Sequence, residues 1–276
     1  YKRQLTTHAK DAVAWLVSLG ADLNTVGRAG GAKYPRAHRP TDGSAIGPEV
    51  IRVLWKAAKD RKMDVRTQTR ATEIIMKDGR VAGVKATTKD GKVYTIDAKA
   101  VVLATGGFGA NQDMLVKYQP KLKGYATTNQ PGATGDGIIL AEHAGAALVD
   151  MKQIQAHPTA APDGTLISES VRGDGGILIN AEGKRFTNEL LTRDVVSAAE
   201  LKQPGRFAWV FWDDATRKSA KLMDSYISMG LAVKGNTVAE IAKAMNVPAA
   251  ELEATLKAYA AGKAAGKDAF GRADMP

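Results

Sequence analysis

The sequence contains no cysteine, which excludes disulfides, thiolate metal sites, iron–sulfur ligation and covalent haem attachment within its 276 residues. Long apolar runs are also missing, since none approaches the roughly 20 residues that a membrane-spanning helix needs. The first ten residues, YKRQLTTHAK, lack the apolar core of a signal peptide. We therefore expect no membrane insertion by this segment. The absence of cysteine does not decide the compartment.

Aromatic residues are scarce, at 6% of the chain, and this bears on the net charge of +10. A basic chain can bind nucleic acid, but here Lys and Arg are spread along the sequence with few aromatic residues among them. We therefore expect no nucleic-acid partner. The charge predicts either a solvated basic surface or attraction of a small anionic substrate towards a cleft.

Hydrophobic residues make up 44% of the chain, enough for a sizeable core in one large domain or two smaller ones. Apolar residues recur at helical spacing in several segments, and the first of these is followed by Gly20, a typical helix stop. The predicted helices span residues 9–19, 48–60, 136–143, 237–245 and 248–261. The final stretch, AAGKAAGKDAFGRADMP, is rich in small residues, and we expect it to be unstructured.

Short alternating runs between residues 65 and 104 predict strands, separated by the turn sequences KDGR and KDGK. The expected structure is a three-stranded meander that returns to a buried strand at residues 100–104. This last run is continuously apolar and ends in Thr105-Gly106-Gly107. Such a pattern is typical of a central strand whose C-terminal end contacts a ligand. A dinucleotide-binding domain is the simplest inference.

A glycine-rich loop, GATGDG, comes directly before the predicted helix at residues 136–143. Glycines allow close backbone approach, helix N-terminal amides face anions, and Asp136 can accept hydrogen bonds from hydroxyls. Alone this pattern is weak, because such turns are common. Beyond Met151 the composition changes, so we predict a domain boundary near residue 150.

Several motifs occur together in register: VGRAGGAKYPRAHRP, VVLATGGFG, TNQPGATGDG, IQAHPT, ESVRGDGGILIN, EGKRFTNE and TRD. In order and approximate spacing they resemble the fumarate reductase flavoproteins, particularly the soluble type found in flavocytochrome c, over essentially the whole chain. The resemblance implies an α/β fold: a partial Rossmann-like FAD-binding domain with a β-meander at residues 1–150, followed by a mobile α+β capping domain at residues 151–276. The family's N-terminal fingerprint and closing segment are missing here, so we expect an internal fragment that on its own binds FAD weakly or not at all.

The resemblance also assigns residues to the FAD cofactor. The main chain of Thr72 is expected near the adenine, and the Gly30-Gly31-Ala32 loop near the flavin. The full predicted set is Thr72, Ala104, Thr105, Gly106, Asp136, Gly30, Gly31 and Ala32.

In the predicted cap, His157 matches the histidine that holds a substrate carboxylate in the family. A lone histidine is more often structural, but the IQAHPT context favours the binding role. Ser168 and Glu169 match a Thr-Glu pair that contacts the substrate and the proton route. Serine keeps the hydroxyl of threonine and loses a methyl group, so its hydrogen bonding should survive.

Arg193 matches the arginine regarded as the active-site acid of the family. Arginine is almost always protonated in water, so this role requires proton loss to be brief and immediately reversed. Glu169 and Arg172 are three residues apart and would share a face of a helix, so with Arg193 they resemble the family's Arg–Glu–Arg proton relay. The structural alternative is a salt-bridge network that only stabilises the cap.

The activity that the resemblance implies is reduction of fumarate to succinate, with hydride from N5 of the reduced flavin and a proton from Arg193. Alternatives are a same-fold flavin enzyme acting on another enoate, such as urocanate or an acrylate, or a non-catalytic remnant or basic binding module. Within the family we expect an electron-donor domain or protein, with any haem or FMN outside this segment. A periplasmic location is favoured over a cytoplasmic one by the resemblance alone.

Overall fold

The computed structural model describes residues 2–27, 29, 32–219 and 222–275. Contacts divide the chain into two compact units. The first comprises Tyr1–Lys62, Ala156–Ala161 and Leu166–Pro276, and the second comprises Met63–Gln155 and Pro162–Thr165. The domain boundary predicted near residue 150 separates a cofactor-binding segment from a substrate-covering segment. This division by function stays a prediction.

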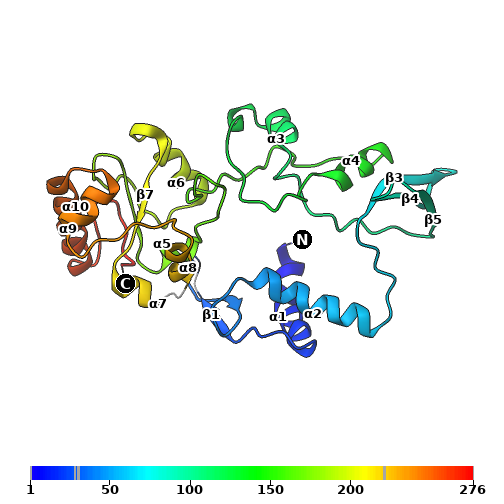
Figure 1. Ribbon diagram of the computed structural model, residues 1–276, viewed down its shortest axis with the longest axis horizontal. Coiled ribbons are helices and arrows are strands. Elements are labelled where there is room, and N and C mark those ends of the chain that lie inside the picture. The colour runs from blue at the N-terminus through cyan, green and yellow to red at the C-terminus, as the bar shows by residue number, and fades with distance from the viewer. Residues whose placement is uncertain (1, 28, 30–31, 220–221, 276) are drawn as a thin grey trace. The chain divides into compact units, whose positions relative to one another are not determined.

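The β-meander of the second unit is present as predicted. Strands β3 (Thr69–Lys77), β4 (Arg80–Thr88) and β5 (Val93–Asp97) form an antiparallel sheet in that order (Figure 1). Asp78 and Gly79, from the KDGR sequence, have φ values of 51° and 73° at the turn between β3 and β4. Positive φ at both positions suits a two-residue hairpin turn, and glycine adopts it without strain.

The prediction of a central strand at residues 100–104 is wrong. These residues form no strand, and the Val102 side chain is 88% exposed. A strand buried on both faces needs neighbouring strands to pair with its backbone. None of the strands within the described part of the chain pairs with residues 100–104.

The helices of the second unit are short, and a side chain caps the first of them. The Asn111 side chain accepts a hydrogen bond from the Met114 backbone N–H, which defines the start of the first helix. The helix predicted at residues 136–143 is confirmed with the same bounds. The elements are α3 (Gln112–Tyr118), η1 (Pro120–Leu122) and α4 (Asp136–His143).

The N-terminal part of the first unit contains two helices and a small hairpin. Val53 is 1% exposed and packs with Ala21 and Leu23 in a small core. The predicted first helix begins earlier than expected, and the second matches its prediction within two residues. The elements are α1 (Lys2–Ser18), β1 (Thr25–Gly27), β2 (Ala37–Arg39) and α2 (Ile46–Asp60).

Helices outnumber strands in the remainder of the first unit, whose described residues also form a two-stranded antiparallel sheet. Both predicted C-terminal helices are confirmed, and Thr237 caps the first of them by accepting a hydrogen bond from Glu240 N–H. The elements are α5 (Glu169–Gly173), β6 (Ile177–Ile179), α6 (Arg193–Glu200), η2 (Pro204–Arg206), β7 (Trp209–Phe211), α7 (Asp214–Ser219), α8 (Leu222–Ser228), α9 (Val238–Met245) and α10 (Ala249–Ala264).

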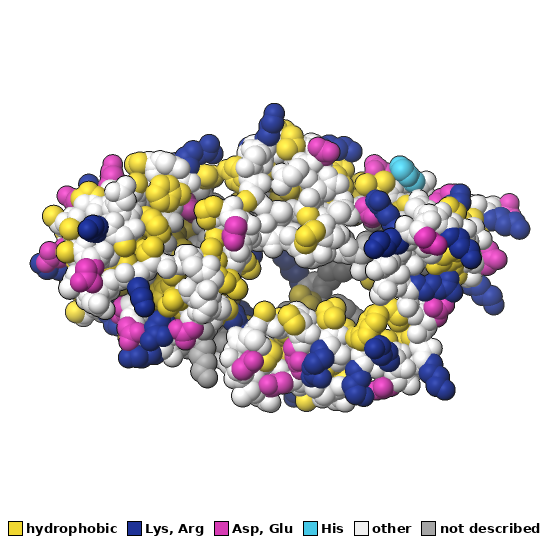
Figure 2. Space-filling view, viewed as in Figure 1, with side chains coloured by type: hydrophobic (Ala, Val, Ile, Leu, Met, Phe, Trp, Pro, Cys, Tyr) yellow, Lys and Arg dark blue, Asp and Glu magenta, His cyan; other side chains and the backbone are white. Residues whose placement is uncertain are grey.

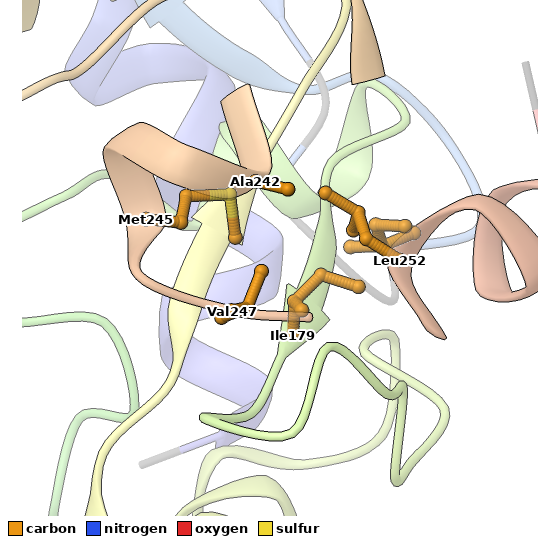
Figure 3. Close-up of a cluster of buried hydrophobic side chains, with 6 residues drawn as sticks. Ile179, Ala242, Met245, Val247 and Leu252 are labelled. Carbon is orange, nitrogen blue, oxygen red and sulfur yellow. The ribbon is translucent and has the colours of Figure 1, made fainter. Parts of the chain in front are cut away.

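The main apolar core of the first unit joins strand β6 to helices α9 and α10 (Figure 3). Ile179 and Leu252 are both fully buried within it. Burial of side chains of this size stabilises the fold by about 1.5–3 kcal/mol each. Strand β6, within the segment GGILIN, therefore lies in this core.

A buried ionic cluster of four side chains fixes the end of the described chain. Glu189 accepts hydrogen bonds from Arg185 (2.9 and 2.8 Å) and from Arg272 (2.8 Å), while Arg185 also bonds Asp268 at 2.6 Å. Glu189 and Arg272 are 0% exposed. Residues 265–275 have no regular secondary structure, but these ion pairs anchor them to the first unit. The prediction that this end of the chain is unstructured is therefore wrong.

The outer surface carries most of the remaining charge. Figure 2 shows Lys and Arg side chains dispersed over several elements, with Asp and Glu among them. Among the described residues, no helix is both long and apolar enough to cross a membrane.

Candidate functional site

In the second unit, the ATGG segment meets the glycine-rich loop at the start of α4. A Cβ placed on Gly137 would collide with the Oγ1 and Cβ atoms of Thr105. Only glycine leaves room for this contact, so Gly137 holds Thr105 beside the helix. Thr105 and Asp136, two predicted cofactor residues, are thereby brought together.

Asp136 is fixed by two side chains. Thr134 donates to Oδ1 at 2.8 Å, and Arg70 on β3 donates to Oδ2 at 2.9 Å. These hydrogen bonds, the one from Thr134 first, lower the pKa of Asp136 below its ordinary value against the opposing effect of burial. The carboxylate is ionised at neutral pH, and each of its oxygens keeps a lone pair that can accept from a ligand hydroxyl.

Thr72 lies two residues after Arg70 on the same strand. The β3–β4 register shifts between Ala71 and Glu73, so Thr72 has no partner in it. A bulge of this kind leaves the bulged residue out of the strand ladder. The Thr72 main chain can therefore receive a ligand, the contact predicted for it.

The other predicted cofactor residues differ in how the structure places them. Ala104, Thr105 and Gly106 are exposed and lie outside any helix or strand. Ala32 is half-buried in the first unit, and Gly30 and Gly31 lie outside the described residues. The Thr72, Thr105 and Asp136 environment of the second unit thus fits a nucleotide cofactor, through an open backbone, an ionised acceptor and a close glycine contact.

A substitution tests whether this contact positions the cofactor site. We expect Gly137→Ala to displace Thr105, at a cost of about 1–3 kcal/mol in folding stability, the usual effect of overpacking, and thereby to weaken FAD binding by the full-length protein. Titration of the apoprotein with FAD measures it. Gly145→Ala, at a helix end with open space around it but positive φ, controls for general backbone strain. Equal FAD affinity in the Gly137→Ala and native proteins would contradict the placement.

In the first unit, the three residues predicted to form a proton relay come together. The Glu169 carboxylate accepts a 2.8 Å hydrogen bond from Arg193 Nη2, and its other oxygen lies 3.6 Å from Arg172 Nη2. Glu169 and Arg172 occupy the same short helix, α5, as their spacing requires. Arg193 is the first residue of α6, so two helices supply the three charges.

The three side chains of the relay differ in their exposure to solvent. The side chains of Arg193, Glu169 and Arg172 are 36%, 19% and 1% exposed. Burial alone would raise the pKa of Glu169, but the hydrogen bond and charge of Arg193 and the charge of Arg172 bring that pKa below its ordinary value. Burial also lowers the pKa of Arg172, which favours brief loss of its proton.

His157 faces the same charges with an unpaired nitrogen. The Thr159 backbone N–H donates to His157 Nδ1 at 3.2 Å, so the neutral ring carries its hydrogen on Nε2. Burial, and then the charges of Arg193 and Arg172, lower the pKa of His157 to about 4. The buried Nε2 has no hydrogen-bond partner among the described residues. His157 is therefore a neutral N–H donor that can bind a carboxylate oxygen.

Ser168 is the N-cap of α5, with its hydroxyl accepting from Ser170 N–H at 3.3 Å. Its own N–H donates to the Tyr226 hydroxyl at 2.8 Å, which fixes the backbone before the helix. Arg39 of β2 donates to the Ser168 hydroxyl at 3.5 Å. The predicted substrate pair Ser168–Glu169 thus lies beside a further cation, Arg39.

Sequence reasoning did not single out Arg39, Gly137 or Glu189. Glu189 belongs to the EGKRFTNE segment and pairs with Arg185, but that segment is not helical, so a four-residue spacing did not by itself indicate an ion pair. Gly137 follows Asp136 in GATGDG and could have been separated from the turn glycines as the one inside a helix. Arg39 gave no signal, since its contact with Ser168 joins residues 129 apart in sequence.

Comparison with known proteins identifies the family of the chain. The model of the family described as FAD binding domain matches residues 1–275. The fumarate reductase (cytochrome) of Shewanella frigidimarina is 44% identical over 99% of the chain and 48% of its own length, and the NADH:acrylate oxidoreductase of Vibrio harveyi is 34% identical over 96% and 27%. A solved open conformation of a flavocytochrome c3 fumarate reductase aligns with a TM-score of 0.76 and 44% identity, over 98% of this chain and 48% of that one.

The chain spans about half the length of the first curated relatives that it matches. The family match confirms FAD as the cofactor, and the structural match confirms the predicted fold class. The chain therefore belongs to the FAD binding domain family, together with the fumarate reductases that it resembles.

Proposed function

We propose that the full-length protein reduces an enoate, with fumarate as the first-choice substrate and succinate as the product. The observation that carries this proposal is the arrangement around Glu169, which joins the partly exposed Arg193 to the buried Arg172. A salt-bridge network that only stabilised the fold would not require the neutral, unpaired Nε2–H of His157 beside it. An anionic substrate explains both features.

Binding and polarisation of the substrate come from this chain's own donors. His157 Nε2–H donates to one substrate carboxylate oxygen, and the Ser168 hydroxyl contacts the substrate. An alkene beside a carboxylate accepts hydride poorly, so cationic groups must stabilise the negative charge that develops. Arg193 supplies that charge from the partly exposed end of the relay.

FAD, when bound and reduced, supplies the hydride. Arg193 donates the proton to the neighbouring carbon, and Glu169 returns a proton to Arg193 from Arg172. Because Glu169 is hydrogen-bonded to Arg193, the proton moves over a 2.8 Å contact and the neutral arginine is short-lived. The same proposal includes binding of FAD by the predicted cofactor residues, which are Thr72, Ala104, Thr105, Gly106, Asp136, Gly30, Gly31 and Ala32.

An electron-donor domain or protein and a periplasmic location complete the proposal. The name of the fumarate reductase (cytochrome) of Shewanella frigidimarina supports an electron donor. The periplasmic location rests on the family resemblance of the motifs alone. A second candidate is another enoate, which the name of the acrylate oxidoreductase relative favours. The experiment that separates them is turnover of the full-length, FAD-loaded protein with a reduced dye and fumarate, urocanate or acrylate. Preference for fumarate supports the first proposal, and turnover of acrylate alone supports the second.

His157→Ala tests the substrate-binding role. We expect KM for fumarate to rise about tenfold or more while kcat changes little, because a hydrogen bond made equally in the ground and transition states is lost. Since the pKa of His157 is about 4, the native KM should not change through ionisation of this histidine between pH 6 and 8. Steady-state kinetics measure both. His8→Ala, on the exposed surface of α1, is the control. An unchanged KM would show that His157 is structural.

A further inference from the structure

Arg172, the inner end of the relay, is sealed from solvent. Its residue exposure is 0%, and its Nη1 donates to the Glu189 main-chain oxygen at 2.5 Å. Each turnover removes one proton from the relay, so Arg172 must be resupplied. Because bulk water does not reach its guanidinium, another ionisable group has to carry the proton inwards.

Helix α6 presents such a group. Glu200 lies seven residues after Arg193, which places both on one face about 10 Å apart along the axis. Val196 and Ser197, at the intermediate positions of that face, are buried, so the face is turned into the protein. Glu200 itself is only partly buried and has access to solvent.

Unpaired buried polar atoms occur on α5, which carries Arg172, and on α6, which carries Glu200. Arg172 Nε and Nη2 and the Ser197 hydroxyl are buried without hydrogen-bond partners among the described residues. Buried polar groups of this kind are normally satisfied, often by internal water. Arg172 Nη2 lies 3.6 Å from Glu169, so the Nε–H of Arg172 is the group that water can bridge to another carboxyl near it.

Burial of Glu200 favours a protonated carboxyl, and the charge of Arg172 acts on that carboxyl. Burial raises the pKa of Glu200 to about 7, while the Ala208 backbone N–H and the Arg172 guanidinium act in the opposite direction. Arg172 in turn faces Glu169, Arg193 and Glu189. At neutral pH, Glu200 exists in both its acid and its base form, as a proton carrier requires.

We propose that Glu200 is the solvent-side member of the relay and passes protons from bulk water to Arg172. This inference rests on the proposed function. In each turnover Arg193 gives its proton to the substrate carbon, Glu169 transfers one from Arg172 to Arg193, and Glu200 reprotonates Arg172. Glu200 then takes a proton from solvent, so the protein ends the cycle with the protons it began with.

The proposal separates the first turnover from the later ones. In the full-length, FAD-loaded protein, Arg193 starts protonated, so Glu200→Gln should leave single-turnover reoxidation of the reduced flavin by fumarate within about twofold of native. Steady-state kcat at pH 7 should fall about tenfold or more, since a general acid commonly contributes more than that. The native decline of kcat as pH rises through about 7 should also disappear in the variant, because above its pKa the carboxyl cannot donate.

Two further variants complete this test. Glu253→Gln, on the exposed surface of α10, should change neither rate. Glu200→Asp, which keeps the carboxyl, should recover most of the steady-state rate and carries the test if Glu200→Gln does not load FAD. A Glu200→Gln steady-state rate within twofold of native would overturn the proposal. Equal loss of the first and later turnovers would overturn it as well, by assigning Glu200 a structural role. Failure of the native protein to be reoxidised by fumarate would instead reject the proposed function.

Discussion

Arg193→Ala is expected to lower the rate of fumarate reduction by the full-length protein by about 10²–10⁴-fold, the range typical of a lost general acid. The substitution removes the proton donor and its 2.8 Å contact with Glu169. FAD content should stay unchanged, because the contacts proposed for Asp136 and Thr105 do not involve Arg193. Stopped-flow reoxidation of the reduced flavin measures the rate, and its absorbance measures the content.

The matched control for this substitution is Arg3→Ala, which removes the same charge from the exposed surface of α1. The control should keep the native rate, so that any loss in Arg193→Ala is not an effect of net charge. An Arg193→Ala variant with near-native turnover would remove Arg193 from the role of acid and would favour a purely structural salt-bridge network.

Glu189→Ala is expected to destabilise the protein by about 3–5 kcal/mol, because it leaves Arg185 and Arg272 buried with too little negative charge. Both guanidinium groups bond the Glu189 carboxylate, and Arg272 also donates to the Arg172 main-chain oxygen at 3.0 Å. Loss of the cluster should therefore loosen the helix that carries the relay. Thermal and urea unfolding of the full-length protein measure the effect.

Glu253→Ala is the control, since it breaks an exposed ion pair with Lys257 on α10. A pair of this kind contributes about 0–1 kcal/mol. If Glu189→Ala were no more destabilising than Glu253→Ala, the buried cluster would not be what anchors residues 265–275.

Local sequence patterns predicted the elements whose causes are local. The meander follows from alternating residues and from the Asp78-Gly79 turn, and helix α4 follows from its glycine-rich start. The strand expected at residues 100–104 failed because its apolar run predicts burial without identifying a pairing partner. Strand pairing is non-local, and the described chain supplies no partner there.

The candidate site shows the same limit. Glu169 and Arg172 could be predicted together because they are three residues apart on one helix. Motif resemblance was needed to add His157 and Arg193, which come from other segments. The cluster of Glu189 and Arg272 was missed because its partners are 83 residues apart, and nothing in the small-residue-rich end of the chain indicated a buried arginine.

The central claim is most directly tested by reducing the FAD-loaded, full-length protein with a dye and adding fumarate without oxygen. Flavin absorbance reports reoxidation, and product analysis reports succinate. The account predicts rapid reoxidation with one succinate formed per flavin. Bound flavin that fumarate cannot reoxidise would contradict it, leaving the fold and the FAD family intact but the substrate wrong.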